Sequence, residues 1–258
     1  MSLVDVALTL LIGVATGLLS SSVGVGGAVI STPGIRMLGA TPLEGVGSTL
    51  PSILPSAITG TRRYWREGLV YRPVVAKVAP WGALAGIAGA MASVRIPGRG
   101  HVQMILSALL VLFTAWRTSR PASAGAQTAT AESHFEWWRC AVIGIGAGGL
   151  SGFLGVGGGI LMVPAFRSWL RLDLKVTVAT SLACVGLLAI PSMITHTLEG
   201  TVNWAFAVPL SIGVIPGAHL GSRWAVGASD RHLRLWIGVG LGVIGLGYLG
   251  AELLTLAT

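Results

Sequence analysis

The residues whose types and spacing could do chemistry are glycines inside apolar sequence. The segment GVGG occurs twice, at residues 24–27 and 155–158, and each copy is followed by a proline, Pro33 or Pro164. Glycine in a helix interior is less favourable than alanine by about 1 kcal/mol. In a bilayer, an interrupted helix also leaves backbone groups that need partners inside the protein or in a cavity. We therefore expect a break in each of the two helices.

A helix that starts just after such a break directs its first backbone N–H groups toward the glycines. These N–H groups carry partial positive charge and bind anions. Two helix starts brought to one place would bind a single anion from two sides. The sequence therefore predicts an anion-binding site made by the two glycine-rich segments, with Gly24, Val25, Gly26 and Gly27 from the first and Gly155, Val156, Gly157 and Gly158 from the second.

Close helix packing is the competing interpretation of the glycines. Small residues four positions apart let the backbones of membrane helices approach one another. We assign this role to four pairs, which are Gly13/Gly17, Gly82/Gly86, Gly217/Gly221 and Gly238/Gly242. The two GVGG segments differ because their glycines are clustered and the cluster is repeated, and there we favour a functional break.

Hydroxyl and imidazole side chains are the other candidate ligands. Ser48-Thr49 and Thr180-Ser181 occupy equivalent places in the two halves of the chain, and Ser22 directly precedes the first glycine-rich segment. Each hydroxyl can bind an anion, or it can bond to a carbonyl one turn back in its own helix. His219 lies within an apolar segment and His196 at the end of another. Either histidine could carry a proton or be neutral and packed; His219 joins the candidate site, and the roles of both stay open.

The positions of the carboxylates exclude several classes of function. All nine Asp and Glu fall at the ends of apolar segments or between them. This is unfavourable for a cation site or a proton relay inside the membrane, and it is compatible with an anionic substrate. The apolar segments also contain no paired carboxylates, nucleophile–base pair or metal-ligand cluster. We therefore expect no enzyme, no metal and no cofactor, and we interpret Cys140 and Cys184 as small buried hydrophobes.

The composition places these residues in a membrane protein. Of the 258 residues, 53% are hydrophobic and 10% are charged, against about 25% charged in soluble domains. Several apolar segments approach the ~20 residues that span a bilayer. The net charge of +8 comes from basic residues between these segments, where they act as topology signals and do not indicate nucleic-acid binding. We predict an all-α polytopic membrane protein.

The chain divides into two halves of similar pattern. Residues 118–137 are rich in Ala, Ser and Thr, a composition that predicts a flexible linker. They separate a first transmembrane repeat, 1–117, from a second, 138–258, which matches it at an offset of 131 residues. The apolar segments run roughly over 3–35, 43–61, 73–94, 102–116, 138–166, 175–195, 204–226 and 233–254.

The distribution of positive charge decides between parallel and inverted repeats. If each glycine-rich segment turns back as a hairpin and is followed by three more helices, each half crosses an odd number of times. Fourteen of the 17 Lys and Arg then lie on one side, as the positive-inside rule expects; simple crossings split them about evenly. We predict two inverted repeats with 8–10 membrane helices in total, a cytoplasmic linker and both termini outside.

At these residues the sequence resembles the TauE/SafE family of membrane transporters, also called the toluene-sulfonate uptake permease group. The resemblance covers nearly the whole chain. It rests on the duplicated GVGG-to-proline segments, on GST (47–49) and ATS (179–181), and on two EG turns followed by GALAG or GAHLG. The copies differ, because the first reads GVGGAVIS and the second GVGGGILM. The two half-sites are therefore not chemically identical.

The resemblance implies transport of small sulfur-containing anions such as sulfite, sulfoacetate or other organosulfonates. We expect a secondary transporter of the cell inner (plasma) membrane, an exporter, that holds the anion at the glycine-rich helix N-termini and works by alternating access. A passive anion channel and a transporter of small carboxylates are the alternatives. The expected partners are the anion and the lipid bilayer, without nucleic acid. The particular anion, the coupling ion and a homo-oligomeric state stay open.

Overall fold

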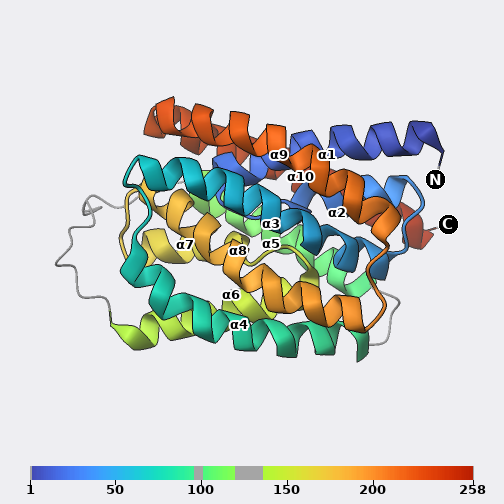
Figure 1. The fold of residues 1–258 in the computed structure, drawn as a ribbon, viewed down its shortest axis with the longest axis horizontal. Coiled ribbons are helices and arrows are strands. Elements are labelled where there is room, and N and C mark those ends of the chain that lie inside the picture. The colour runs from blue at the N-terminus through green and yellow to red at the C-terminus, as the bar shows by residue number, and fades with distance from the viewer. Residues whose placement is uncertain (1, 96–100, 120–135, 258) are drawn as a thin grey trace.

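The computed structural model describes residues 2–95, 101–119 and 136–257, which form ten α-helices (Figure 1). In chain order these are α1 (Leu3–Val23), α2 (Ala28–Met37), α3 (Pro42–Arg66), α4 (Arg72–Arg95), α5 (His101–Ser119), α6 (Trp137–Leu154), α7 (Gly159–Ser168), α8 (Leu174–Leu198), α9 (Trp204–Gly227) and α10 (Asp230–Ala257). Within the described ranges, α1, α4, α8 and α9 are long and apolar enough to cross a membrane, judged by length and composition. The prediction of an all-α membrane protein is confirmed.

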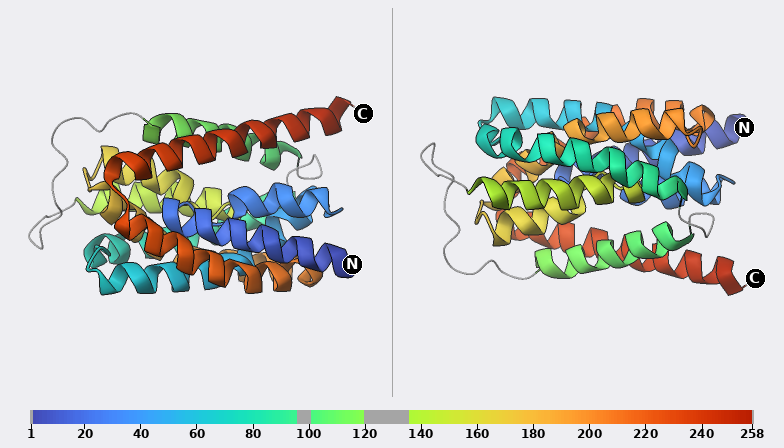
Figure 2. Two further views of the ribbon diagram at one scale, coloured as in Figure 1. Left: turned by 90° about the horizontal axis from the view of Figure 1, so that it is seen from above. Right: turned by 90° about the horizontal axis from the view of Figure 1, so that it is seen from below.

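Each half of the chain has the same order of helices. A long helix, α1 or α6, is followed by one of ten residues, α2 or α7, and then by three longer helices. The two ten-residue helices lie toward opposite ends of the molecule, with α2 in the half that holds the N-terminus (Figures 1 and 2). Each of them turns back toward the end from which the preceding long helix came.

Helices of the first half pack against helices of the second half. Helix α1 packs against α9, and its counterpart α6 packs against α4. In the same way α3 contacts α9, α8 contacts α4, and the equivalent pairs α3–α8 and α5–α10 contact each other. If each helix of the first half is exchanged with its counterpart in the second half (α1 with α6, α3 with α8, α4 with α9, α5 with α10), the same set of contacts results.

Glycine allows the closest of these contacts. A Cβ on Gly17 or Gly217 would overlap the backbone of the facing helix in the α1–α9 pair. In the α4–α6 pair, a Cβ on Gly148 would overlap the carbonyl of Gly82. The packing prediction is confirmed for the pairs in α1, α4 and α9. It is wrong for Gly242 in α10, where an added Cβ meets nothing within 4 Å.

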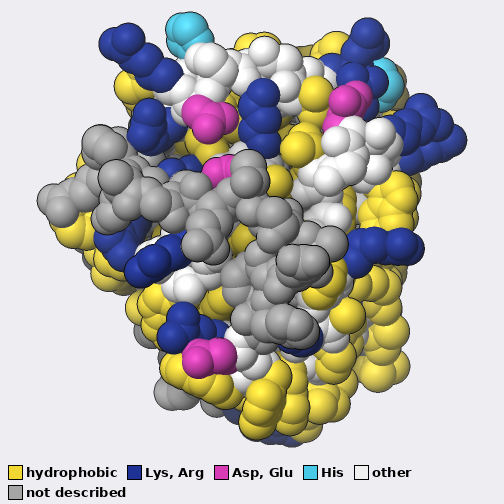
Figure 3. All heavy atoms as spheres, turned by 90° about the vertical axis from the view of Figure 1, so that its left-hand side faces the viewer, with side chains coloured by type: hydrophobic (Ala, Val, Ile, Leu, Met, Phe, Trp, Pro, Cys, Tyr) yellow, Lys and Arg dark blue, Asp and Glu magenta, His cyan; other side chains and the backbone are white. Residues whose placement is uncertain are grey.

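One end of the molecule is rich in basic side chains. Both termini lie at one end, and α5 ends and α6 begins at the other (Figure 1). Lys and Arg side chains gather at that second end, which we call the arginine-rich end (Figure 3). Most of the predicted linker, residues 120–135, lies outside the described residues, and its edges at Ser119 and Trp137 belong to α5 and α6. Cys140 and Cys184 are buried free thiols, as predicted.

Candidate functional site

Both long helices end at the glycine-rich segments, as the sequence predicts. Helix α1 ends at Val23, and Gly24 and Gly26 follow in the left-handed region with φ of 74° and 86°. Helix α6 ends at Leu154, and Gly155, Gly157 and Gly158 have φ of 68°, 84° and 69°. Residues with side chains rarely adopt this backbone conformation. The glycines are therefore required where each helix ends and the chain reverses.

The two breaks meet inside the molecule. A Cβ added to Gly26 would lie 3.0 Å from the carbonyl oxygen of Val156 and 3.2 Å from the Cα of Gly157. A Cβ on Gly157 would lie 3.3 Å from the Cα of Gly26. The backbone of one break thus packs against the backbone of the other, although Gly26 and Gly157 are 131 positions apart in the sequence.

The helices that follow the breaks begin without side-chain caps. Helix α2 has Gly27 at its N-cap and α7 has Gly158, and neither residue can offer a side-chain acceptor. The first N–H groups of a helix have no partner within that helix. The N–H of Gly159 donates to the carbonyl of Gly157 at 2.9 Å, and no side chain caps either helix start. Both breaks therefore place helix N-termini without side-chain caps at the junction between the halves.

Two of the predicted hydroxyls hold the breaks in place. The Oγ of Ser181 in α8 donates a hydrogen bond of 2.7 Å to the carbonyl of Gly24. The Oγ1 of Thr49 in α3 lies 3.5 Å from the carbonyl of Gly155 and 3.1 Å from that of Val46 in its own helix. Each hydroxyl reaches the break of the opposite half. These carbonyls belong to helix C-termini, which would otherwise lack a donor.

The neighbouring hydroxyls bind the starts of other helices. Ser48 accepts a bond of 2.8 Å from the backbone N–H of Asn203, just before α9. Thr180 accepts a bond of 3.0 Å from the backbone N–H of Tyr71, just before α4. A hydroxyl that accepts still has its own proton to donate. Ser48 and Thr180 are thus equivalent to each other, as are Thr49 and Ser181. Each of these hydroxyls joins one half of the chain to the other.

Ser22 is also buried near the first break. Its hydroxyl donates to the carbonyl of Leu19 at 3.1 Å and accepts from the indole N–H of Trp236 at 3.1 Å. This contact joins the end of α1 to α10.

The histidines have different surroundings. His219 is exposed on α9, and it is the one predicted site residue that is not buried with the others. His196 is buried, with Nε2 2.9 Å from the carbonyl of Gly152 and Nδ1 2.8 Å from the hydroxyl of Thr201. Because a carbonyl only accepts, Nε2 carries a proton and Nδ1 is free to accept. His196 therefore joins α8 to α6 near the second break.

Sequence reasoning missed Thr16. This α1 residue is buried, and its hydroxyl has no hydrogen-bond partner in the described part of the chain. With Ser20, Gly26 and Gly27 it lines a void beside the first break that is too narrow in this conformation for a water molecule. At the repeat offset of 131, Ala147 occupies the equivalent position. That difference between the repeats was the available signal.

Ser151 shows a second difference between the halves. It is buried in α6, and its hydroxyl also has no partner among the described residues. Its counterpart Ser20 accepts a bond of 3.1 Å from Ser56 in α3. The equivalent of Ser56 in the second half is Leu188, which cannot donate. The polar character of the two breaks is therefore unequal.

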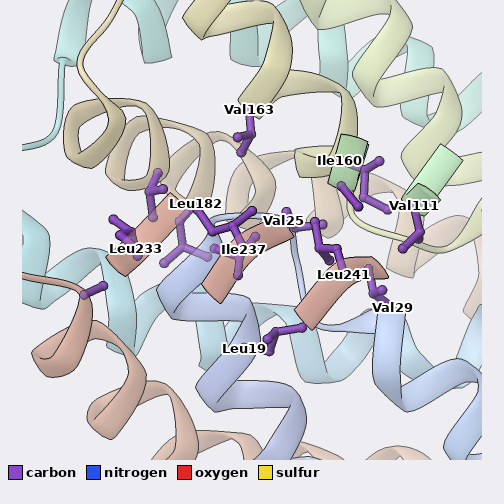
Figure 4. Packing of buried hydrophobic residues seen from close by; sticks show 14 of the residues in the cluster. Leu19, Val25, Val29, Val111, Ile160, Val163, Leu182, Leu233, Ile237 and Leu241 are labelled. Atoms are coloured by element: carbon purple, nitrogen blue, oxygen red, sulfur yellow. The ribbon is translucent and has the colours of Figure 1, made fainter. Parts of the chain in front are cut away.

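Apolar packing surrounds the first break. Val25 lies in a buried cluster with Leu19, Leu182, Ile237 and Leu241 (Figure 4). The last two side chains come from α10, which passes over the break. The junction between the halves is consequently closed in this conformation.

These features define a class of protein: a multi-pass helical membrane protein with two helices interrupted at glycines inside the membrane, the architecture of many secondary transporters. Comparison with known families gives the particular group. The family described as "Sulfite exporter TauE/SafE" matches residues 9–248. The chain belongs to this family of membrane transporters.

Individual relatives carry consistent descriptions. The chain is 24% identical over 214 residues to "Probable membrane transporter protein YdhB" of Bacillus subtilis, covering 81% of this chain and 85% of that protein. It is 27% identical over 231 residues to a "Probable membrane transporter protein" of Xylella fastidiosa, covering 86% of this chain and 85% of the relative. No solved structure matches the chain significantly.

Proposed function

We propose that the protein is a secondary transporter that exports a small sulfur-containing anion, such as sulfite, sulfoacetate or another organosulfonate, across the plasma (inner) membrane. The observation that carries the proposal is the contact between Gly26 and Gly157, which brings two uncapped helix starts together. The family description supports the sulfur-containing substrate class.

The anion binds at the junction of the two breaks. The N–H groups at the starts of α2 and α7 donate to its oxygens, and no fixed positive charge is needed. Thr16 adds a buried hydroxyl on the side of the first break. Ser181 and Thr49 position the glycines by holding the carbonyls of Gly24 and Gly155. The backbone can approach the anion closely because the glycines have no side chains.

Transport proceeds by alternating access between two inverted repeats. Three observations support this arrangement: the neighbours that are unchanged when the halves are exchanged, the opposite placement of α2 and α7, and the two termini at one end. The arginine-rich end faces the cytoplasm, following the positive-inside rule. The narrow void at the first break corresponds to a closed state, and a rocking motion of one half would open it. An open anion channel would need a continuous path through the protein, whereas the junction is closed in this conformation. This observation favours a transporter over a channel.

The test measures binding and transport by the purified protein. Radiolabelled sulfite binding is competed with sulfoacetate and with acetate, and flux is measured in liposomes. Gly26→Leu and Gly157→Leu should each weaken sulfite binding about tenfold or more, equivalent to about 1.4 kcal/mol. Gly242→Leu is the matched control, because a Cβ added at Gly242 meets nothing within 4 Å.

Three outcomes would overturn parts of the proposal. Unchanged sulfite binding in both break variants would remove the glycine site. Stronger competition by acetate than by sulfoacetate would identify a carboxylate transporter. Currents far above transporter turnover would identify a channel.

A further inference from the structure

We propose that a groove between α3, α4 and α8, at the arginine-rich end, binds one anionic phospholipid. The groove has a volume of about 630 Å³ and is separate from the glycine breaks. It opens on the outer surface of the helix bundle, where an embedded protein contacts lipid.

The mouth of the groove is cationic. Arg62 near the end of α3 and Arg72 at the start of α4 both line it, and both are exposed. The guanidinium of Arg72 lies 4.3 Å from the ring centroid of Trp65, which also lines the groove. Arginine binds phosphate through two parallel N–H groups, and tryptophan is typical of the membrane interface. The mouth therefore suits a lipid phosphate.

The interior of the groove is apolar. Leu54 and Ile58 of α3 line one side, and Leu187 and Ile190 of α8 line the other. Ile58 is 66% exposed, which is high for a large apolar side chain. Gly186 of α8 also lines the groove, and a Cβ there would lie 2.9 Å from the Cβ of Ala57, so α3 and α8 pack closely beneath it. An acyl chain would cover this surface.

The depth of the groove matches one leaflet. Leu54 and Trp65 are eleven positions apart on α3. At 1.5 Å per residue this is about 16.5 Å, and half of the hydrocarbon core is about 15 Å. A phospholipid with its phosphate at the arginines would thus extend its chain to the bilayer centre.

The fold itself does not require the arginines. At the offset of 132 residues that aligns Ser48-Thr49 with Thr180-Ser181, Ile194 stands for Arg62 and Trp204 for Arg72. The equivalent face of the second half therefore lacks both cations. The charged mouth occurs only at the end that the proposed orientation places in the cytoplasm, where anionic lipids attract basic groups. This charge complementarity identifies the occupant as an anionic lipid.

The experiment counts lipids bound to the full-length protein by native mass spectrometry in neutral detergent. Dioleoyl phosphatidylglycerol is compared with dioleoyl phosphatidylcholine, and thermal stability is recorded with each lipid. We expect the wild-type protein to bind phosphatidylglycerol with at least about tenfold preference. The double variant Arg62→Gln/Arg72→Gln should lose that preference. Arg66→Gln is the matched control, since this arginine lies one turn from Arg62 but does not line the groove.

A second variant tests the groove without changing charge. Ala76→Trp places a large side chain at an exposed lining position, so it should reduce phosphatidylglycerol binding while the protein stays folded. Equal binding of the two lipids by the wild type, or undiminished preference in both groove variants, would overturn the proposal. So would a dimer in phosphatidylcholine nanodiscs that Ala76→Trp dissociates, because a second copy would then occupy the groove. Sulfite binding is measured in parallel for the wild type and for every variant. If none of them binds sulfite, the result counts against the proposed function and does not affect the lipid proposal.

Discussion

At the residue scale, the site depends on backbone groups and a few uncharged side chains. Gly24 and Gly155 end their helices in the left-handed conformation, and Gly26 and Gly157 let the two breaks touch. A residue with a side chain in this conformation costs about 1–2 kcal/mol. The steric clash between the two breaks would add to that cost. Glycine is therefore needed for both conformation and contact.

Thr16 provides the first prediction at this scale. Thr16→Val keeps the shape of the side chain and removes a hydroxyl that has no hydrogen-bond partner among the residues the structure describes. Thermal stability should be unchanged or slightly higher, because an unpaired buried polar group is unfavourable. Sulfite binding should nevertheless fall, since the hydroxyl contributes to the anion site. A variant that binds sulfite like the wild type in a scintillation assay would exclude Thr16 from the site.

Ser181 and Thr49 provide the second prediction. Ser181→Ala should lower the free energy of unfolding by about 1 kcal/mol, because it removes a buried hydrogen bond to Gly24. Thr49→Ser, which keeps the hydroxyl, is a control for the threonine side. Thr49→Ala should cost less than Ser181→Ala, since its distance to Gly155 is 3.5 Å against 2.7 Å. Urea unfolding followed by tryptophan fluorescence measures the order, and the reverse order would contradict it.

At the element scale, the breaks are positioned by closely packed long helices. The α1–α9 and α4–α6 pairs approach at glycines, and these pairs carry the C-terminal ends of α1 and α6 to the junction. Helices α3 and α8 then supply the hydroxyls from the opposite half. The ten-residue helices α2 and α7 are too short to span the bilayer, at about 15 Å each. Their starts therefore stay inside the protein.

Gly148 tests the importance of this packing. Gly148→Ala places a methyl group against the backbone of Gly82 in α4, and such overpacking costs about 1–3 kcal/mol. The melting temperature should fall, and the second break should shift because α6 leads directly to it. Gly242→Ala in α10 should leave the melting temperature unchanged or raise it, since its Cβ meets open space. Equal melting temperatures for the two variants would contradict this account.

At the scale of the whole molecule, the proposed orientation across the membrane rests on charge and on helix order. Cationic side chains gather at one end, and both termini lie at the other (Figures 1 and 3). The groove proposed to bind lipid lies at the arginine-rich end, with Arg62 and Arg72 at its mouth. The proposed orientation leads to one prediction, which concerns the molecule as a whole.

Cysteine labelling in intact cells tests the orientation. Cys140 and Cys184 are buried, so an introduced cysteine should dominate the labelling. Ser2→Cys at the N-terminus should react with an impermeant maleimide from outside. Ser229→Cys, between α9 and α10 at the arginine-rich end, should react only after the membrane is permeabilised. The opposite pattern would reverse the molecule, and labelling of both residues from one side would end the inverted-repeat interpretation.

The sequence by itself determined the membrane class, the helix breaks and most of the close-packing glycines. Local physics is sufficient there, because clustered glycines end a helix and long apolar segments require a bilayer. The sequence also indicated the family, since the duplicated motifs keep their order over nearly the whole chain.

Only the tertiary structure decided which groups meet. Ser181 bonds to a carbonyl 157 residues away, and Ser48 accepts from an N–H 155 residues away. The exposure of His219, the open space at Gly242 and the unpartnered hydroxyl of Thr16 likewise depend on neighbouring helices. A side chain's partners lie across the interface between the two halves, and no local pattern specifies how helices from distant segments face one another there.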